Sequence, residues 1–201
     1  MYKFFKILSA IFSPLLAPTY AMLLASYLTI LRILPTGTLW GAIGIVFAIT
    51  AVIPAAGILS LHKAGIVSDT GLNQQSERTI PYIIVILCYA ATAFFLFHAH
   101  APRWLPMFMV GAGAATLINI VVNRWWKISA HAAGMGGLVA MLFRVAAEHQ
   151  AITDLAPWIT VAVLLAGLVM TGRVYMGRHT LLQVLAGAAN GFLCVWLVSN
   201  L

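Results

Sequence analysis

Long runs of apolar residues alternate with short polar segments along almost the whole chain. A helix that crosses a bilayer needs about 20 consecutive, mostly apolar residues. The pattern predicts seven spans, of which the fifth and sixth are short: 4–31, 39–61, 81–99, 105–123, 131–147, 155–172 and 179–200. We therefore expect an all-α, polytopic integral membrane bundle of six or seven spans, formed as a single membrane domain over residues 1–201.

The polar segments fall into two sets, which seven alternating spans place on opposite sides of the membrane. One set follows the second, fourth and sixth spans, at 62–80, 124–130 and 173–178. The other follows the first, third and fifth spans, and it is accompanied by tryptophans that we interpret as an interfacial aromatic belt: Trp40, Trp104 and Trp158. Almost all candidate chemistry lies in the first set, which predicts one functional site at one end of the bundle.

Composition supports a membrane protein, because 63% of the residues are hydrophobic and only 7% are charged. The formal charge of +7 comes without any basic run, and most cations adjoin a span. This arrangement favours lipid headgroups and an anionic substrate over a nucleic-acid partner. Lys3 and Lys6 are interpreted as headgroup anchors.

One polar motif carries a cation, a histidine and an amide over eleven residues: Arg173-Val-Tyr-Met-Gly-Arg-His179-Thr-Leu-Leu-Gln183. His179 stands where a predicted helix begins, and Gln183 lies one turn further along the same face. The N-terminus of a helix attracts anions, phosphate in particular. The motif therefore indicates an anion site with an imidazole beside it.

Two further motifs lie in the same set of loops. In Lys127-Ile-Ser129-Ala130-His131, Ser129 is a plausible helix N-cap that puts His131 in the first turn. Arg78 comes just before a span, three residues ahead of Pro81, which suits the first turn of a helix. No carboxylate cluster and no third ligand for the two histidines are evident, so we predict neither a metal nor a cofactor.

Taken in order, these motifs resemble the type 2 phosphatidic acid phosphatase (PAP2) superfamily, which shares a core with vanadium haloperoxidases. That family shows an Arg before a Pro, then Ser-Gly-His, then Arg-x5-His-x3-Asp. The resemblance covers a catalytic core of about residues 70–191 and rests on three matches: Arg78 near Pro81, Ser129-Ala130-His131, and Arg173-x5-His179-x3-Gln183. This chain departs from the family pattern at three positions. Gly71 stands in place of the family Lys, Ala130 in place of the family Gly, and Gln183 in place of the family Asp.

The resemblance implies a metal-independent phosphatase that acts on a lipid phosphate or diphosphate. His179 would form a phosphohistidine, and His131 would act first as general acid and then as general base. Phosphate oxygens would be held by charged side chains and helix amides: Arg78, Arg173, Ser129, Ala130 and Lys127, the last replacing the missing family Lys. Gln183 could accept the His179 Nδ1–H and fix its tautomer without supplying charge.

Two alternatives stay open at this point. One is a catalytically weakened relative that binds or moves phospholipids, and the other is a lipid phosphotransferase. The expected partners are membrane lipids and a phospholipid or polyprenyl phosphate substrate, and the sequence determines neither the lipid nor the oligomeric state.

The expected location is the inner (cell) membrane of a bacterium. Eight Lys and Arg residues on the site's side against three on the other would place the site in the cytoplasm. Three of the eight, Arg78, Lys127 and Arg173, are candidate phosphate ligands, and Arg124 is a further candidate; without these four the count is four against three. The family resemblance favours a site that faces the periplasm or the cell exterior.

Overall fold

The computed structural model describes residues 1–200, and Leu201, the last residue of the predicted domain, lies outside them. The described residues form nine α-helices: α1 (Tyr2–Ile11), α2 (Ala17–Leu28), α3 (Thr36–Phe47), α4 (Ile53–Lys63), α5 (Thr79–His98), α6 (Trp104–Val122), α7 (Ala130–Ala147), α8 (Ala156–Tyr175) and α9 (Leu181–Val198). They make 7 spans long and apolar enough to cross a membrane, because α1 with α2, and α3 with α4, each form one span. The predicted all-α membrane bundle is thus confirmed, with the span limits within a few residues of those expected.

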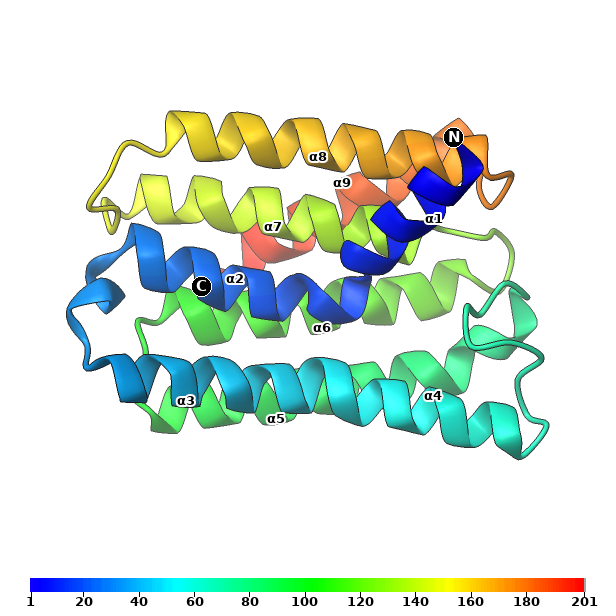
Figure 1. The fold of residues 1–201 in the computed structure, drawn as a ribbon, viewed down its shortest axis with the longest axis horizontal. Helices are drawn as coiled ribbons and strands as arrows, with labels where there is room; N and C mark the ends of the chain where they lie inside the picture. The colour runs from blue at the N-terminus through cyan, green and yellow to red at the C-terminus, as the bar shows by residue number, and fades with distance from the viewer. Residues whose placement is uncertain (201) are drawn as a thin grey trace.

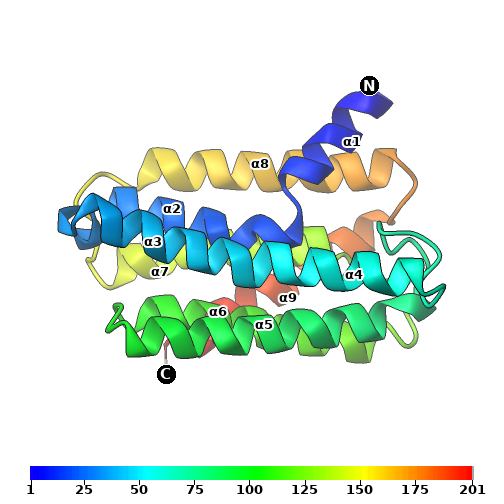
Figure 2. The same cartoon turned by 60° about the horizontal axis from the view of Figure 1, so that its bottom comes forward.

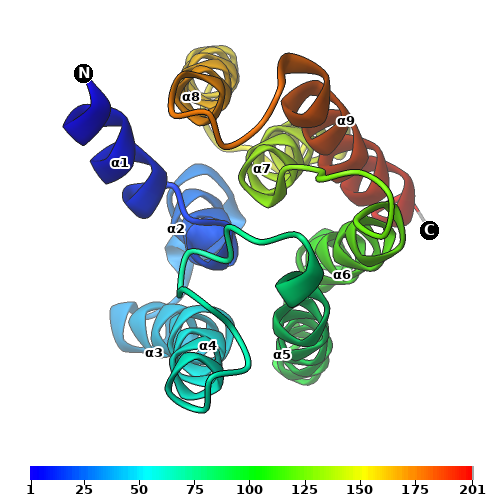
Figure 3. The ribbon, with the colours of Figure 1, turned by 90° about the vertical axis from the view of Figure 1, so that its right-hand side faces the viewer.

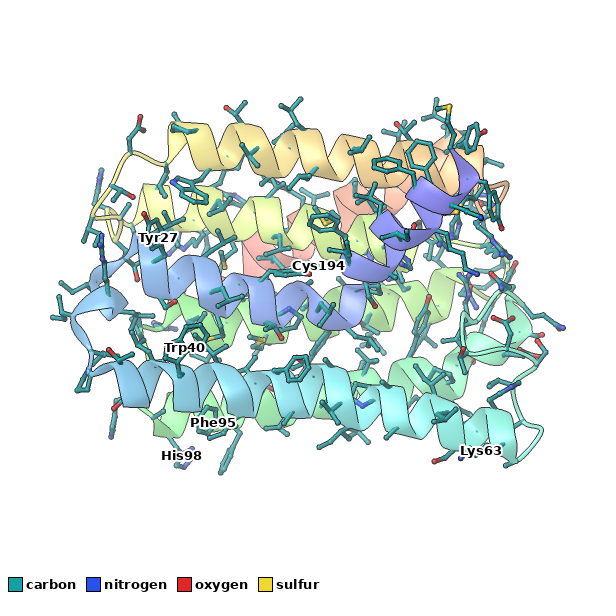
Figure 4. The ribbon with its side chains drawn as sticks, viewed as in Figure 1. Tyr27, Trp40, Lys63, Phe95, His98 and Cys194 are labelled. Carbon is teal, nitrogen blue, oxygen red and sulfur yellow. The ribbon has the colours of Figure 1, made fainter. Side chains whose placement is uncertain are left out.

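The spans run side by side, so the two sets of loops lie at opposite ends of the bundle (Figure 1). Lys63, which ends α4, is at the end that carries the predicted site (Figure 4). His98 and Trp40 are toward the other end in the same view. The predicted separation of the two loop sets is therefore present in the fold.

Prolines account for the two interrupted spans. Ser13 is extended, with φ −61° and ψ 140°, because the residue before a proline is disfavoured in the helical region, and a short 3₁₀ turn then begins at Pro14. In the second span Pro54 has no N–H to donate, and the preceding turn, Ala48–Val52, is a π-helix. The first interruption lets α1 leave the axis of α2.

Helix α7 lies at the centre of the bundle, and small residues let α9 approach it closely. A Cβ added at Gly191 would lie 1.9 Å from the backbone oxygen of Ala133, and one added at Gly136 would lie 2.1 Å from that of Ala188. No side chain fits at such distances, so only glycine permits this contact. The close approach holds the start of α7, which carries His131, against α9, which begins just after His179.

One expectation about the aromatic belt is wrong. Trp40 and Trp158 are exposed by 61% and 37%, but Trp104 is exposed by only 1%. Trp104 packs in the hydrophobic core with Leu105 and other buried side chains. Its position at a helix start suggested the interface, whereas the packing of α6 turns the ring inward.

Helix α1 diverges from the bundle at an angle, as Figure 2 shows. Seen from the end that carries the site, α1 stands beside α8 and α2, and the segment 64–75 crosses the bundle end from α4 to α5 (Figure 3). These two segments, together with the loops before α7 and α9, enclose the site.

Candidate active site

A cavity of about 730 Å³ extends into the bundle from the end that carries the predicted motifs. Its charged and imidazole-bearing lining residues are Lys6, Asp69, Arg78, His131, Arg173, Arg178 and His179. Its deeper wall includes apolar side chains, among them Ile58, Val85, Phe108 and Val195. Arg78 and Tyr89 both line it and are eleven residues apart, which on a helix is a rise of about 16 Å. The cavity therefore joins a cationic entrance to an apolar interior.

Arg78 is fixed in the cavity wall by two loops. Its Nε donates to the Leu72 carbonyl at 2.9 Å, and its Nη1 donates to the Ile128 carbonyl at 3.2 Å. The residue is only 5% exposed. The Arg78 side chain also contacts the Tyr82 hydroxyl. Since a guanidinium has five N–H donors, donors remain that can bind an anion in the cavity.

Arg173 lies in the last turn of α8, where it is 8% exposed. Within residues 1–200 its Nε has no hydrogen-bond partner. A buried donor without an acceptor is costly, and the cost is larger for a charged group. An anion in the cavity would remove this cost, so the wall around Arg173 favours a bound oxyanion.

The His179 ring is held with one nitrogen free. Its Nδ1 lies 3.1 Å from the Lys127 backbone oxygen and 3.3 Å from Gln183 Oε1. A backbone carbonyl only accepts, so Nδ1 carries the proton and Nε2 keeps its lone pair. Burial, followed by the positive charges of Arg173 and Arg78, lowers the pKa of His179 from 6.5 to about 4. The imidazole is thus neutral at pH 7 and has a nucleophilic nitrogen.

His131, in the first turn of α7, also lines the cavity. Its Nε2 lies 3.1 Å from the backbone oxygen of Ser9 in α1. By the same reasoning Nε2 carries the proton, and Nδ1 is the nitrogen left to exchange a proton. The structure thus brings the two predicted histidines and the two predicted arginines to one cavity.

A family model described as the PAP2 superfamily matches residues 81–201. The chain belongs to the PAP2 superfamily. A search of the curated proteins and a search of the solved structures gave no match. The matched region begins just after Arg78, so α1 to α4 lie outside it even though three of these helices, α1, α2 and α4, contribute to the cavity wall.

Gln183, which stands where the PAP2 pattern has Asp, has a clear local role. Its Oε1 accepts from the Thr180 backbone N–H at 3.1 Å, and the backbone N–H of Gln183 donates to Thr180 Oγ1 at 3.4 Å. This is a reciprocal capping box at the start of α9. Since the Thr180 N–H is a donor, the amide oxygen must face it, and the same oxygen faces His179 Nδ1. The side chain therefore both caps a helix and supplies the second acceptor to His179.

The other predicted phosphate ligands are less directly placed. Ser129 is fully buried, and its Oγ accepts from the Ala132 N–H at 3.3 Å as an N-cap. Ala130 lines the cavity, whereas the lining includes neither Ser129 nor Lys127. Burial, followed by the charges of Arg78, Arg173 and Arg178, lowers the pKa of the Lys127 amine. Lys127 thus lies in the field of the arginines, and its use as a phosphate ligand stays a prediction.

Sequence analysis missed two features that shape the site. Gln75 Nε2 donates to the backbone oxygen of Asn123 at 2.6 Å, and Asn123 Nδ2 donates to the backbone oxygen of Gln75 at 2.7 Å, which ties the loop before Arg78 to the loop before α7. Lys6, interpreted as a headgroup anchor, lines the cavity. No local signal marks either role, because both depend on contacts between distant segments.

Proposed function

We propose that this chain is a metal-independent phosphatase that hydrolyses a lipid phosphate or lipid diphosphate through a phosphohistidine. The observation that carries the proposal is one cavity whose entrance holds two histidines and several cations and whose interior is apolar. Such a cavity suits a molecule with a phosphate at one end and a hydrocarbon chain at the other. Membership of the PAP2 superfamily supports a phosphatase-type activity.

In the first step His179 Nε2 attacks phosphorus while the bond from phosphorus to the lipid oxygen breaks. Protonated His131 gives its proton to the leaving oxygen of a phosphate monoester, which leaves as an alcohol. Arg78 and Arg173 hold the phosphoryl oxygens and offset the charge that develops on them. The intermediate is a phosphoryl group bound to His179, with His131 neutral.

In the second step neutral His131 takes a proton from water as the water oxygen attacks phosphorus. The bond from phosphorus to His179 Nε2 then breaks, which releases inorganic phosphate and returns His131 to its protonated form. Because the Nδ1–H of His179 stays bonded to the Lys127 carbonyl, Nε2 is again unprotonated when phosphate leaves and can attack the next substrate. Attack by a lipid alcohol in place of water would give the phosphotransferase alternative.

Positive charge in this scheme comes from arginines, so no metal is required. Within the described residues no group of three or more His, Cys, Asp or Glu side chains is placed to hold a metal ion. We further propose that the protein resides in the inner membrane of a bacterium, with the cavity facing the periplasm or exterior. The family resemblance favours that side.

The testing experiment is phosphate release by purified protein from a panel of lipid monophosphates and polyprenyl diphosphates, in EDTA and with or without vanadate. We expect turnover of at least one lipid in EDTA and inhibition by vanadate, which resembles phosphate in charge and shape. Strict dependence on Mg²⁺ would refute the mechanism. Saturable lipid binding without turnover would instead support the weakened relative, which the uncharged Gln183 favours.

A further inference from the structure

Helix α1 forms part of the cavity although it lies outside the region matched by the family model. Tyr2, Lys6 and Ser9 line the cavity from α1, and Ser13 and Pro14 continue the lining beyond its end. The helix lies apart from the axis of α2 (Figure 2). This wall of the site is therefore supplied by a segment that the matched part of the chain does not contain.

The contact that matters is between α1 and the predicted general acid. The Ser9 carbonyl oxygen lies 3.1 Å from His131 Nε2, across 122 residues of sequence. Ser9 is 8% exposed, so the bond is shielded from competing water. A carbonyl acceptor at Nε2 fixes the ring's rotation and its tautomer together.

A second contact fixes α1 in place. Phe5 is 5% exposed and packs against Gly172 of α8, where an added Cβ would come within 2.6 Å of the Phe5 ring. The ring centroids of Phe5 and Tyr175 are 5.2 Å apart. Phe5 and Ser9 are four residues apart and so share one face of α1, which means that seating Phe5 on α8 also seats Ser9 over the cavity.

We propose that α1 is a positioning element of the active site, in which Phe5 anchors the helix to α8 so that the Ser9 carbonyl orients His131. The proposal rests on the proposed phosphatase function. His131 then keeps its Nε2–H on Ser9 throughout the cycle. The proton that reaches the leaving oxygen comes from Nδ1, and the proton taken from water returns to Nδ1.

Two adjacent phenylalanines provide a matched test. Phe5→Ala removes the buried anchor, whereas Phe4→Ala removes a ring that is 54% exposed on the same helix. General acid–base catalysis contributes about 10²–10⁴ in rate, so we expect Phe5→Ala to lower kcat at least tenfold with KM nearly unchanged. Phe4→Ala should stay near the parent rate. Phe5→Leu, whose side chain fills part of the space that the Phe5 ring occupies against Gly172, should recover part of the lost kcat.

A cysteine pair tests position separately from packing. A Cβ at position 172 would lie 3.4 Å from the Phe5 Cβ, close to the span of about 3.5–4.5 Å that a disulfide requires. Phe5→Cys with Gly172→Cys, in a protein without the two native cysteines, should be slow when reduced. Oxidation should restore most of the rate, because the disulfide returns α1 to α8 without restoring the ring.

An additional measurement does not depend on turnover. Diethylpyrocarbonate modifies neutral imidazole, and mass spectrometry can follow its addition to His131. Release of Ser9 should make this modification severalfold faster in Phe5→Ala than in Phe4→Ala. Equal modification of the two variants, or equal kcat together with no effect of oxidation on the cysteine pair, would overturn the role of α1. Failure of the parent protein to hydrolyse any lipid on the panel would overturn the phosphatase proposal, and the modification rates would still decide the α1–His131 contact.

Discussion

Replacing Gln183 by leucine tests how the His179 ring is held. The ring has two acceptors at Nδ1, the Lys127 carbonyl at 3.1 Å and Gln183 Oε1 at 3.3 Å. Of these two contacts the leucine removes only the longer, so the carbonyl still fixes the tautomer; it also removes the bond from the Thr180 N–H to Gln183 Oε1. When His179 attacks phosphorus its ring becomes positively charged, and a hydrogen bond to a charged group contributes about 1.5–3 kcal/mol.

The lower value applies here, because one N–H is shared between two acceptors and the Gln183 contact is the longer. About 1.5 kcal/mol corresponds to a loss of about tenfold in kcat. Losing the tautomer costs far more, since replacing the triad Asp of a serine protease by Asn lowers kcat by about 10⁴. We therefore expect Gln183→Leu to be about ten times slower than the parent, with phosphate release measured under single-turnover conditions.

The matched control is Thr180→Ala, which breaks the other half of the same capping box. Loss of a cap costs about 1 kcal/mol of stability, while Gln183 Oε1 remains opposite His179. Thr180→Ala should therefore lower the melting temperature and leave kcat near the parent value. Equal losses of kcat in both variants would show that Gln183 acts only as a cap. A loss near 10⁴ in Gln183→Leu would show that the Lys127 carbonyl does not hold the tautomer.

Three further outcomes follow from the same geometry. His179→Ala and His131→Ala should each abolish phosphate release while circular dichroism shows an intact helical bundle, whereas His98→Ala, at the opposite bundle end, should stay active. Because neutral His179 is the nucleophile and its pKa is about 4, the acid limb of kcat/KM, corrected for substrate ionisation, should lie near pH 4. That acid limb should move to higher pH in Gln183→Glu, whose negative charge favours the protonated ring. In a protein without the native cysteines, Lys63→Cys and His98→Cys should react with an impermeant thiol reagent from opposite sides of the membrane. Labelling of the Lys63→Cys variant in intact cells would support an outward-facing site.

The span pattern could be predicted because it depends on local hydrophobicity. In lipid every backbone polar group must be satisfied within the helix or by its neighbours, so a run of about 20 apolar residues allows few structures. Whether a side chain at a span end faces the lipid or the core depends instead on how the helices pack, which local hydrophobicity does not determine. Trp104 at a span end has the composition of an interfacial residue, yet it is only 1% exposed because of how α6 packs.

Parts of the site could be predicted where residues a few positions apart lie at one helix start. The spacing predicts His179 and Gln183 one turn apart on one helix face, and the structure does place them in contact at 3.3 Å. The helix, however, begins only at Leu181, so the contact arises because the Gln183 side chain reaches back past the N-cap Thr180 to His179. The carbonyl of Lys127 could not be assigned to His179, because every residue has a carbonyl and nothing in the sequence distinguishes this one. Sequence reasoning gave Lys127 a role for its charge, whereas the contact that the structure describes is made by its backbone.

The two histidines are oriented by the same device. Each donates one ring N–H to a main-chain carbonyl, His179 to Lys127 and His131 to Ser9. A carbonyl holds the tautomer without adding a negative charge, so it favours the protonated ring less than a carboxylate in the same place would. The arginines of the cavity supply the opposite field, which falls when an anion binds between them. Binding of phosphate should therefore make protonation of His131 easier at the moment when a general acid is needed, and the absence of a carboxylate at position 183 is consistent with a site whose negative charge arrives with the substrate.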